Sequence, residues 1–258
     1  MKRNEAIYGA IAGEVIGSSY EFKGARFEPI KLFKYDCNYT DDTVLTLAIT
    51  DWLTEANCDV KEKLLTWARA FPHIGFGPSF LRWIVQSNPM PYNSCGNGCA
   101  MRVSAVGCIA NTKDEVMALA KASALPTHNH PEGIKGAQAT ALSIFLARTG
   151  HSKDEIREII SKQFNYNLNR TFEELYSEDY EFHVLCQNTV PEAIICFLQS
   201  SDYEDCIVKA MLINKDTDTS ACIAGAIAAA YYGIPEKIKE RLIDYLPKYF
   251  IDIIERIR

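Results

Sequence analysis

The sequence lacks a long apolar run, an excess of basic residues and any tract of low complexity. Its longest uncharged apolar stretch, Ala221–Ile234, is interrupted by two glycines and falls short of the ~20 residues that cross a bilayer. The 27 basic and 33 acidic side chains give a net charge of −6, which leaves no surplus of cations to neutralise a phosphate backbone. We therefore expect no membrane partner and no nucleic acid as the main partner.

Neither a secretion signal nor a disulfide framework is expected. The basic start, residues 1–3, resembles a signal peptide, but Glu5 and Glu14 interrupt the apolar segment that follows. The cysteines are odd in number, nine, and irregularly spaced, so reduced thiols are expected. Cys95 and Cys99 form a C-x3-C pair, yet no second pair stands at zinc-finger spacing, which disfavours zinc there. These features predict a cytoplasmic protein.

The chain does show hydrophobic residues at helical spacing throughout. With 258 residues, 48% of them hydrophobic, and no linker rich in Gly, Pro or Ser, it is expected to form one domain over residues 1–258. No stretch alternates with the period of a half-buried strand, which predicts an all-α fold. Helices are expected at Asn4–Ser19, Asp42–Ala56, Val60–Ala70, Pro78–Gln86, Ala100–Ile109, Lys113–Ser123, Pro131–Thr149, Lys153–Phe164, Pro191–Gln199, Tyr203–Leu212, Thr219–Tyr232 and Pro235–Arg258, the last with a break at Pro247. Function is expected in the loops between them, at 23–39, 72–78, 87–98, 126–130 and 165–189.

Two short acidic motifs stand at expected helix starts: Thr40-Asp41-Asp42-Thr43, the first acidic motif, and Asp216-Thr217-Asp218-Thr219, the second. Helix capping explains one such motif, because a side-chain oxygen of Asp or Thr accepts an N–H bond at a helix start. A cap needs only one oxygen, however, and a second adjacent carboxylate adds repulsion unless a cation lies between them. Since hard divalent ions bind carboxylate and hydroxyl oxygens, the motifs predict Mg²⁺ or Mn²⁺, with two ions if the motifs converge.

The helices behind these motifs, residues 44–53 and 221–232, are apolar on nearly all sides and belong in the protein centre, where their N-terminal ends can meet. A third carboxylate, Glu21, follows the first helix between Tyr20 and Phe22, which would hold it near the core. A surface glutamate is the alternative.

Three further segments carry weaker signals. Cys95–Arg102 is a Gly-rich turn that leads into an apolar helix, a pattern that exposes backbone N–H groups to an anion such as a phosphate, although a plain turn is the alternative. A second Gly loop, Pro72–Pro78, is equally ambiguous. For His128 and His130, a zinc site or a Cys–His nucleophilic pair lacks a supporting constellation, so we favour a histidine that hydrogen-bonds substrate or neighbouring backbone.

Together these motifs resemble the ADP-ribosylglycohydrolase family over nearly the whole chain. The matching segments, in order, are Gly9–Gly17, Tyr20–Phe22, Thr40–Thr43, Gly96–Gly98 with Met101–Val103, Thr127-His128, and Asp216–Thr219 followed by Ala224–Ala226. The resemblance implies an orthogonal all-α multi-helix bundle with two Mg²⁺ or Mn²⁺ ions in a central cleft. It also implies metal ligands at Thr40, Asp41, Asp42, Asp216, Asp218 and Thr219.

The same resemblance assigns the other site residues. Glu21 corresponds to the family glutamate that lies beside the metals and the scissile bond. The implied contacts to substrate are Gly96, Asn97 and Gly98 around the diphosphate, Gly75 and Gly77 along the ribose or phosphate path, and His128 on the bound ADP-ribose.

Two positions depart from the family pattern. Glu14 stands where Asp is usual, which keeps the charge but lengthens the reach. Asn214-Lys215 stand where small residues precede the second acidic motif, so Lys215 could crowd or partly neutralise the site.

The implied function is a hydrolase that cleaves the bond between C1″ of the distal ribose of ADP-ribose and an acceptor, with an ADP-ribosylated protein or small molecule as substrate. Asp41 and Asp42 would serve the catalytic site as metal ligands, and either Glu21 or a metal-bound aspartate would be the base. The alternative is a metal-dependent ADP-ribose-binding protein without hydrolysis. A monomer is expected.

Overall fold

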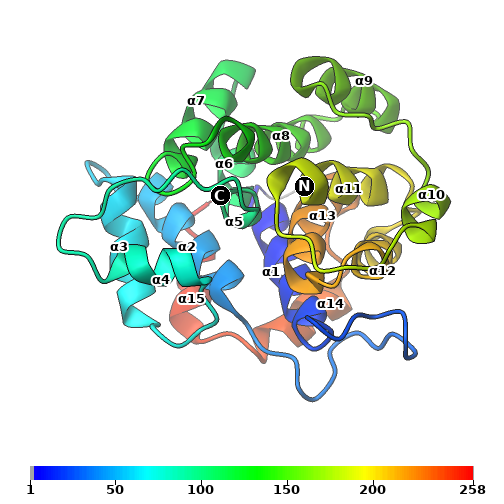
Figure 1. The fold of residues 1–258 in the computed structure, drawn as a ribbon, viewed down its shortest axis with the longest axis horizontal. Coiled ribbons are helices and arrows are strands. Elements are labelled where there is room, and N and C mark those ends of the chain that lie inside the picture. Colours follow the sequence, from blue (N-terminus) through cyan, green and yellow to red (C-terminus); the bar gives the residue numbers. More distant parts are fainter. Residues whose placement is uncertain (1–2, 258) are drawn as a thin grey trace.

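A computed structural model describes residues 3–257 (Figure 1). Their regular structure is helical apart from one isolated antiparallel bridge between Gly96 and Leu185, so the predicted all-α fold is confirmed. The helices are α1 (Glu5–Ser18), α2 (Asp41–Thr54), α3 (Val60–Ala70), α4 (Pro78–Ile84), α5 (Gly98–Met101), α6 (Ser104–Ile109), α7 (Lys113–Ala124), α8 (Pro131–Arg148), α9 (Lys153–Phe164), α10 (Phe172–Ser177), α11 (Cys186–Leu198), α12 (Tyr203–Ile213), α13 (Thr217–Tyr232), α14 (Glu236–Ile243) and α15 (Lys248–Ile254). Within this part of the chain, no helix combines the length and the apolar character needed to cross a membrane.

The helices are arranged around a central pair, α1 and α13, which run side by side in blue and orange in Figure 1. α2, α3, α4 and α15 lie on one side of this pair, and α10, α11 and α12 lie on the other. α7, α8 and α9 cover the upper edge in the same view. The two helices that carry the acidic motifs, α2 and α13, therefore both lie near the centre.

Glycines let α1 and α13 approach closely. Gly9, Gly13 and Gly17 recur at every fourth residue and so lie on one face of α1. A Cβ at Gly13 would lie 2.2 Å from the carbonyl oxygen of Ala221, and one at Gly17 would lie 2.5 Å from that of Thr217. The Thr217 hydroxyl also donates to the carbonyl oxygen of Gly17 at 2.8 Å. This close packing holds the start of α13 beside the end of α1.

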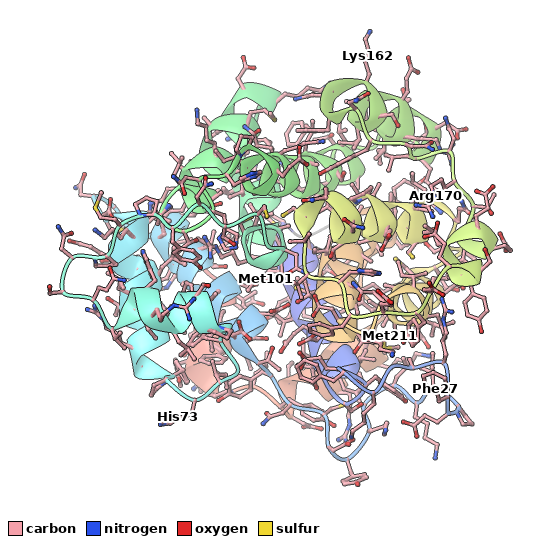
Figure 2. All side chains as sticks on the ribbon, in the orientation of Figure 1. Phe27, His73, Met101, Lys162, Arg170 and Met211 are labelled. Atoms are coloured by element: carbon pink, nitrogen blue, oxygen red, sulfur yellow. The ribbon has the colours of Figure 1, made fainter. Side chains whose placement is uncertain are left out.

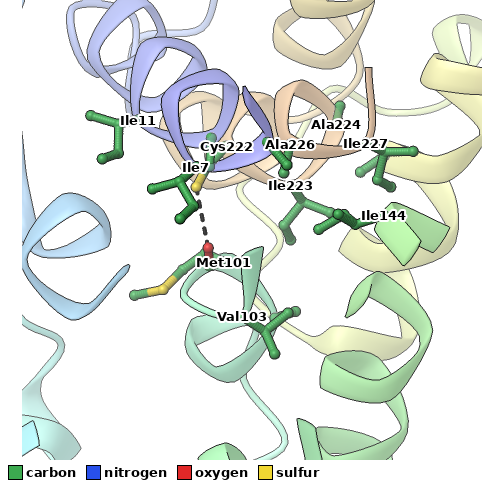
Figure 3. Close-up of a cluster of buried hydrophobic side chains, with 14 of the residues drawn as sticks. Ile7, Ile11, Met101, Val103, Ile144, Cys222, Ile223, Ala224, Ala226 and Ile227 are labelled. Atoms are coloured by element: carbon green, nitrogen blue, oxygen red, sulfur yellow. Dashed lines mark hydrogen bonds between the residues drawn. The ribbon is translucent and has the colours of Figure 1, made fainter. Parts of the chain in front are cut away.

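The short helix α5 packs against the same pair. Figure 3 shows Met101 and Val103 beneath the apolar side chains of α1 and α13, where Cys222 Sγ donates to the carbonyl oxygen of Met101 at 3.3 Å. All three residues are buried. The contact positions the Gly-rich turn relative to the second acidic motif. Cys222 is one of nine free cysteines, in agreement with the expected reduced thiols.

Local capping signals in the sequence correspond to real helix starts. The Thr112 side chain accepts from the Glu115 N–H at 3.1 Å at the start of α7. Ser152 and Glu155 form a reciprocal capping box at the start of α9. These starts were predictable because each cap involves residues only three positions apart.

The predicted start of α11 is wrong. Segment 165–189, predicted as a loop, contains α10 and the first residues of α11, which begins at Cys186 and carries Pro191 inside it. Proline lacks an N–H and favours the first helical position, which is why the prediction began there. The Thr189 N–H instead donates to the carbonyl oxygen of Leu185 at 3.0 Å and starts the helix earlier.

The predicted helix 100–109 is two short helices. α5 ends and α6 begins around Arg102 and Val103, whose ψ angles are near 0°. The buried Arg102 side chain donates to the carbonyl oxygen of Ser123 at 2.8 Å, a distant contact that local periodicity does not contain. The C-terminal helix breaks at Pro247 into α14 and α15, as predicted.

Glu192 of α11 leads to a stability prediction. Its side chain is 9% exposed and its Oε2 has no hydrogen-bond partner. Burial raises the pKa of Glu192 to about 7, against an opposing effect of Arg170. Because the folded pKa lies above the unfolded value of about 4.3, the folded state binds the proton more tightly, and stability falls as pH rises between these two values.

We predict that Glu192→Gln, which stays neutral, is more stable than the wild type by about 1 to 3 kcal/mol at pH 8, with no difference near pH 4. Urea unfolding at both pH values measures this. A difference of the same size at both would contradict it.

Candidate active site

The two acidic motifs meet at the protein centre. α2 begins at Asp41 and α13 at Thr217. The Thr219 hydroxyl of the second motif donates to Asp42 Oδ2 of the first at 3.0 Å, although the two residues are 177 positions apart. The N-terminal ends of α2 and α13 therefore lie close together, as the sequence predicted.

Helix capping does not account for these carboxylates. Asp216 is the N-cap residue of α13, but its side chain makes no capping hydrogen bond; its Oδ2 instead accepts from Asn97 Nδ2 at 2.6 Å. At the start of α2 the cap is Thr40, which accepts from the Asp42 N–H at 3.4 Å. Asp41 and Asp42 lie inside the first turn, so neither is needed as a cap.

Glu21 completes the acidic cluster. Single carboxylate oxygens of Glu21, Asp216 and Asp218 lie within 4.8 Å of one another. Burial, followed by the charges of Asp218 and Asp41, raises the pKa of Glu21 to about 8. The side chain therefore faces other carboxylates in a pocket, and the alternative of a surface glutamate is wrong.

Asp42, Asp216 and Asp218 are buried, whereas Asp41, like Glu21, is half-buried. Burial and the neighbouring Asp218 raise the pKa of Asp41 to about 7 and that of Asp42 well above its usual range. Burial likewise raises the pKa values of Asp216 and Asp218. Among residues 3–257, none of these acidic groups forms a salt bridge with a basic side chain.

The donor set fits a hard divalent cation. It consists of carboxylate and hydroxyl oxygens, the ligands that Mg²⁺ and Mn²⁺ prefer, and it contains no thiolate or imidazole that would favour zinc. A cation among these oxygens would offset the repulsion that otherwise raises their pKa values.

Glu14 holds the first acidic motif against α1. It is fully buried and accepts hydrogen bonds from the Thr40 N–H and the Thr43 hydroxyl. Burial raises the pKa of Glu14 to about 8, although these hydrogen bonds oppose the shift. Glu14 therefore supports the start of α2.

Lys215 does not crowd the site as the sequence suggested. Its Nζ lies 5.8 Å from the centre of the Tyr180 ring, and it does not line the pocket. Its backbone is held by its neighbours, since its carbonyl oxygen accepts from the Phe22 N–H at 3.0 Å and its own N–H donates to the Glu181 carbonyl oxygen at 2.9 Å.

The acidic cluster lines a pocket of about 510 Å³. Figure 2 labels one of its lining residues, Met101 of α5, near the middle of the view. Of the predicted site residues, those that line the pocket are Glu21, Asp41, Asp42, Gly75, Gly77, Gly96, Asn97, Gly98, His128, Asp216, Asp218 and Thr219. Thr40 is the exception and lies behind them, at the cap of α2.

The Gly-rich turn uses two of its N–H groups internally. The Gly96 N–H donates to Ser94 Oγ at 3.1 Å, and the Asn97 N–H donates to the Val184 carbonyl oxygen at 2.8 Å. Gly98, the first residue of α5, has no intrahelical acceptor for its N–H. The turn therefore offers an anion fewer backbone donors than its glycine content predicted.

The two neighbouring histidines have different positions. His130 is the N-cap of α8, where its Nδ1 accepts from the Glu132 N–H at 3.1 Å. His128 lines the pocket and lies against the Gly-rich turn: a Cβ on Gly98 would be 3.4 Å from His128 Nε2.

The second Gly loop approaches the acidic cluster from the opposite wall. Gly75 has a φ of +111°, and a Cβ added to it would lie 3.3 Å from Asp41 Oδ1. A side chain at this position would therefore be strained and would press on a carboxylate. Gly77 lines the same wall and leads into α4.

Several pocket residues were not predicted. Phe22 and Phe182 stack at the rim with ring centroids 4.8 Å apart. Tyr92 and the buried Arg102 line the wall near His128. Phe22 was adjacent to Glu21 in the sequence, but nothing local pointed to Phe182, because the two aromatic residues are brought together only by folding.

Comparison with known proteins identifies the family. The family model described as ADP-ribosylglycohydrolase matches residues 3–257. The chain belongs to the ADP-ribosylglycohydrolase family. It is therefore a hydrolase of that type, as the sequence predicted.

Relatives and a solved structure agree with this assignment. The chain is 25% identical to ADP-ribosylhydrolase ARH3 of Danio rerio, over 89% of this chain and 82% of that protein. It is 24% identical to ADP-ribosyl-[dinitrogen reductase] glycohydrolase of Rhodospirillum rubrum, over 76% of this chain and 70% of that one. A solved ADP-ribosylglycohydrolase-related protein complex has the same fold, with a TM-score of 0.76, 21% identity and coverage of 99% and 98%.

Proposed function

We propose that this chain is a metal-dependent hydrolase that releases ADP-ribose from an ADP-ribosylated protein or small molecule by cleaving the bond at C1″ of the distal ribose. The observation that carries the proposal is the convergence of two acidic motifs and Glu21 in the lining of one pocket. Family membership supports the same reaction class.

The charge distribution of the pocket favours one orientation of ADP-ribose. The pocket lining holds the five carboxylates of the acidic cluster and, around the Gly-rich turn, the Gly98 N–H, the His128 imidazole and the buried guanidinium of Arg102. A diphosphate is repelled by carboxylates and attracted by N–H groups and cations. The diphosphate therefore belongs at the Gly-rich turn, and the distal ribose belongs beside Glu21.

Asp41, Asp42, Asp216 and Asp218, with Thr219, would hold two Mg²⁺ or Mn²⁺ ions, because all five line the pocket and offer oxygen donors. Thr40, the sixth ligand that the sequence implies, does not line the pocket and caps α2 instead. When bound, such ions orient ribose hydroxyls and lower the pKa of water toward neutrality. Asn97 positions the second motif by donating to Asp216 at 2.6 Å.

Glu21 is the proton acceptor in this proposal. Its carboxylate lies beside Asp216 and Asp218 in the pocket, and a carboxylate within reach of the attacking water can act as a general base. Glu21 takes one proton from water as the water oxygen bonds to C1″. The bond from C1″ to the acceptor breaks, and the acceptor leaves with its electron pair and takes up a proton from solvent, while Glu21 returns its proton to solvent. The products are free ADP-ribose and the unmodified acceptor.

Incubation with proteins that carry ADP-ribose on arginine, and separately on serine, tests the proposal. With Mg²⁺ or Mn²⁺ present, free ADP-ribose is expected from one of the two substrates. Release from neither substrate, combined with intact ADP-ribose binding, would contradict hydrolysis and favour a binding protein.

Asp218→Asn tests whether the acidic motifs form a metal site. Asn keeps an oxygen that can accept from the Thr219 N–H, as Asp218 does at 2.9 Å, but it removes one negative charge. Without metal, the variant is expected to be as stable as the wild type or slightly more stable. With metal at 100 times its Kd, the wild type should gain about 2.7 kcal/mol, a melting shift of roughly 5 to 10 °C.

The variant is expected to gain far less on metal addition. Thermal melts of both proteins, with chelator and with Mg²⁺ or Mn²⁺, give the comparison. Equal metal-induced shifts in the two proteins would refute a site shared by both motifs.

A further inference from the structure

Arg102 is a buried cation in the pocket wall that forms no salt bridge with an acidic side chain of residues 3–257. Its side chain is 0% exposed, and its Nη2 donates to two neutral acceptors, the Ser123 carbonyl oxygen at 2.8 Å and Thr127 Oγ1 at 2.9 Å. Its Nε and Nη1 have no hydrogen-bond partner. Burying a guanidinium without a counter-charge is costly, so its place in the fold calls for an explanation.

Thr127 connects Arg102 to His128 through hydrogen bonds. Its Oγ1 lies 2.7 Å from His128 Nδ1. Thr127 Oγ1 accepts a hydrogen bond from Arg102, so the Thr127 hydroxyl proton remains available for donation. Among residues 3–257, the acceptor within reach of this proton is His128 Nδ1. A ring nitrogen that accepts this bond carries no proton, so in the neutral imidazole the proton is on Nε2.

The other ring nitrogen faces the ligand end of the pocket. Within the described residues, the only hydrogen bond of the His128 side chain is the one through Nδ1. His128 lines the pocket, and a Cβ on Gly96 or Gly98 would lie 3.8 or 3.4 Å from Nε2. A proton on Nε2 is therefore available at the Gly-rich turn.

We propose that Arg102 and Thr127 are positioning residues that keep His128 in the tautomer with its proton on Nε2, so that it presents a neutral donor to the anionic group of a ligand at the Gly-rich turn. The identity of that ligand as the ADP-ribose diphosphate rests on the proposed function. Burial and the charge of Arg102 lower the pKa of His128 well below its ordinary value, which keeps the ring neutral and makes the choice of tautomer matter.

Nitrogen-15 NMR of the ligand-free protein tests the tautomer directly. Long-range ¹H–¹⁵N correlation at neutral pH distinguishes a protonated ring nitrogen from one with a lone pair, and His128→Gln identifies the signal among the five histidines. We expect the proton on Nε2 in the wild type. A proton on Nδ1, or on both nitrogens, would overturn the proposal.

Two matched pairs of variants test the positioning residues. Thr127→Ser keeps the hydroxyl and should give the wild-type spectrum, whereas the isosteric Thr127→Val should populate both tautomers. Arg102→Lys keeps a hydrogen-bond donor and should give the wild-type spectrum. Arg102→Met removes the donor and should populate both tautomers. If Arg102→Met does not fold, the Thr127 pair decides. A Thr127→Val spectrum identical to the wild type would overturn the proposal.

Binding of ADP-ribose, measured by calorimetry, tests the ligand. In Thr127→Val we expect roughly two- to tenfold weaker binding, the factor that follows if the competent tautomer falls to between half and a tenth of the population. Unchanged binding with mixed tautomers would overturn the role in ligand recognition. The NMR result does not depend on turnover, so failure of the hydrolase proposal would be distinguishable from failure of this one.

Discussion

Replacement of Glu21 by Gln is expected to lower kcat by at least ~100-fold while changing ADP-ribose affinity little. Gln matches Glu in size and can hydrogen-bond, but it cannot accept a proton at neutral pH. Glu21 faces Asp216 and Asp218 with carboxylate oxygens within 4.8 Å, which places it beside the proposed metal site. The large effect should therefore fall on the chemical step and spare binding.

The measurement is steady-state release of ADP-ribose, with affinity determined separately by calorimetry. Glu158→Gln is the matched control, because Glu158 is an exposed residue of α9 outside the pocket and its replacement should leave kcat unchanged. A Glu21→Gln variant with near wild-type kcat would remove Glu21 from the mechanism and leave an aspartate as the candidate base.

Removal of divalent metal is expected to abolish turnover. The proposed ligands are all carboxylate or hydroxyl oxygens, so Mg²⁺ or Mn²⁺ should restore activity after chelation, and Zn²⁺ should not be the native ion. Because the buried carboxylates have raised pKa values and no basic partners in residues 3–257, loss of the cation should also leave the site electrostatically unfavourable.

The test combines EDTA treatment, elemental analysis of the treated protein, and ADP-ribose release before and after each metal is added back. Activity should disappear with the metal and return with Mg²⁺ or Mn²⁺. Full turnover in a preparation shown to be free of metal would rule out a metal-dependent mechanism.

Much of the site could be predicted because its residues stand in short segments with a recognisable chemistry. The acidic motifs were visible as paired carboxylates at helix starts, and Glu21 as a carboxylate between Tyr20 and Phe22. Capping boxes such as Ser152 with Glu155 were equally visible. In each case the interacting groups lie within a few positions, so the pattern and the interaction coincide.

Other features could not be predicted, because distant contacts override local signals. α11 starts at Cys186, five residues before Pro191. Leu185, which directly precedes the helix, pairs with Gly96 of the Gly-rich turn in an antiparallel bridge. The break between α5 and α6 coincides with the burial of Arg102. The expected interference from Lys215 was wrong because its side chain packs toward Tyr180.

The all-α fold and the identities of the acidic residues follow from the chain alone, because helical periodicity, capping and paired carboxylates are properties of neighbouring residues. Tertiary structure decided whether the carboxylates meet: Thr219 reaches Asp42 across 177 positions, and Asn97 reaches Asp216 across 119. It also decided which histidine faces the pocket. His128 and His130 are two positions apart, but His130 caps α8 whereas His128 lines the pocket and is held by Thr127, which accepts from Arg102. His128 is buried and His130 is half-buried, and the long-range bond from Arg102 to Thr127 lies beside His128 only. Neither feature exists before the chain folds.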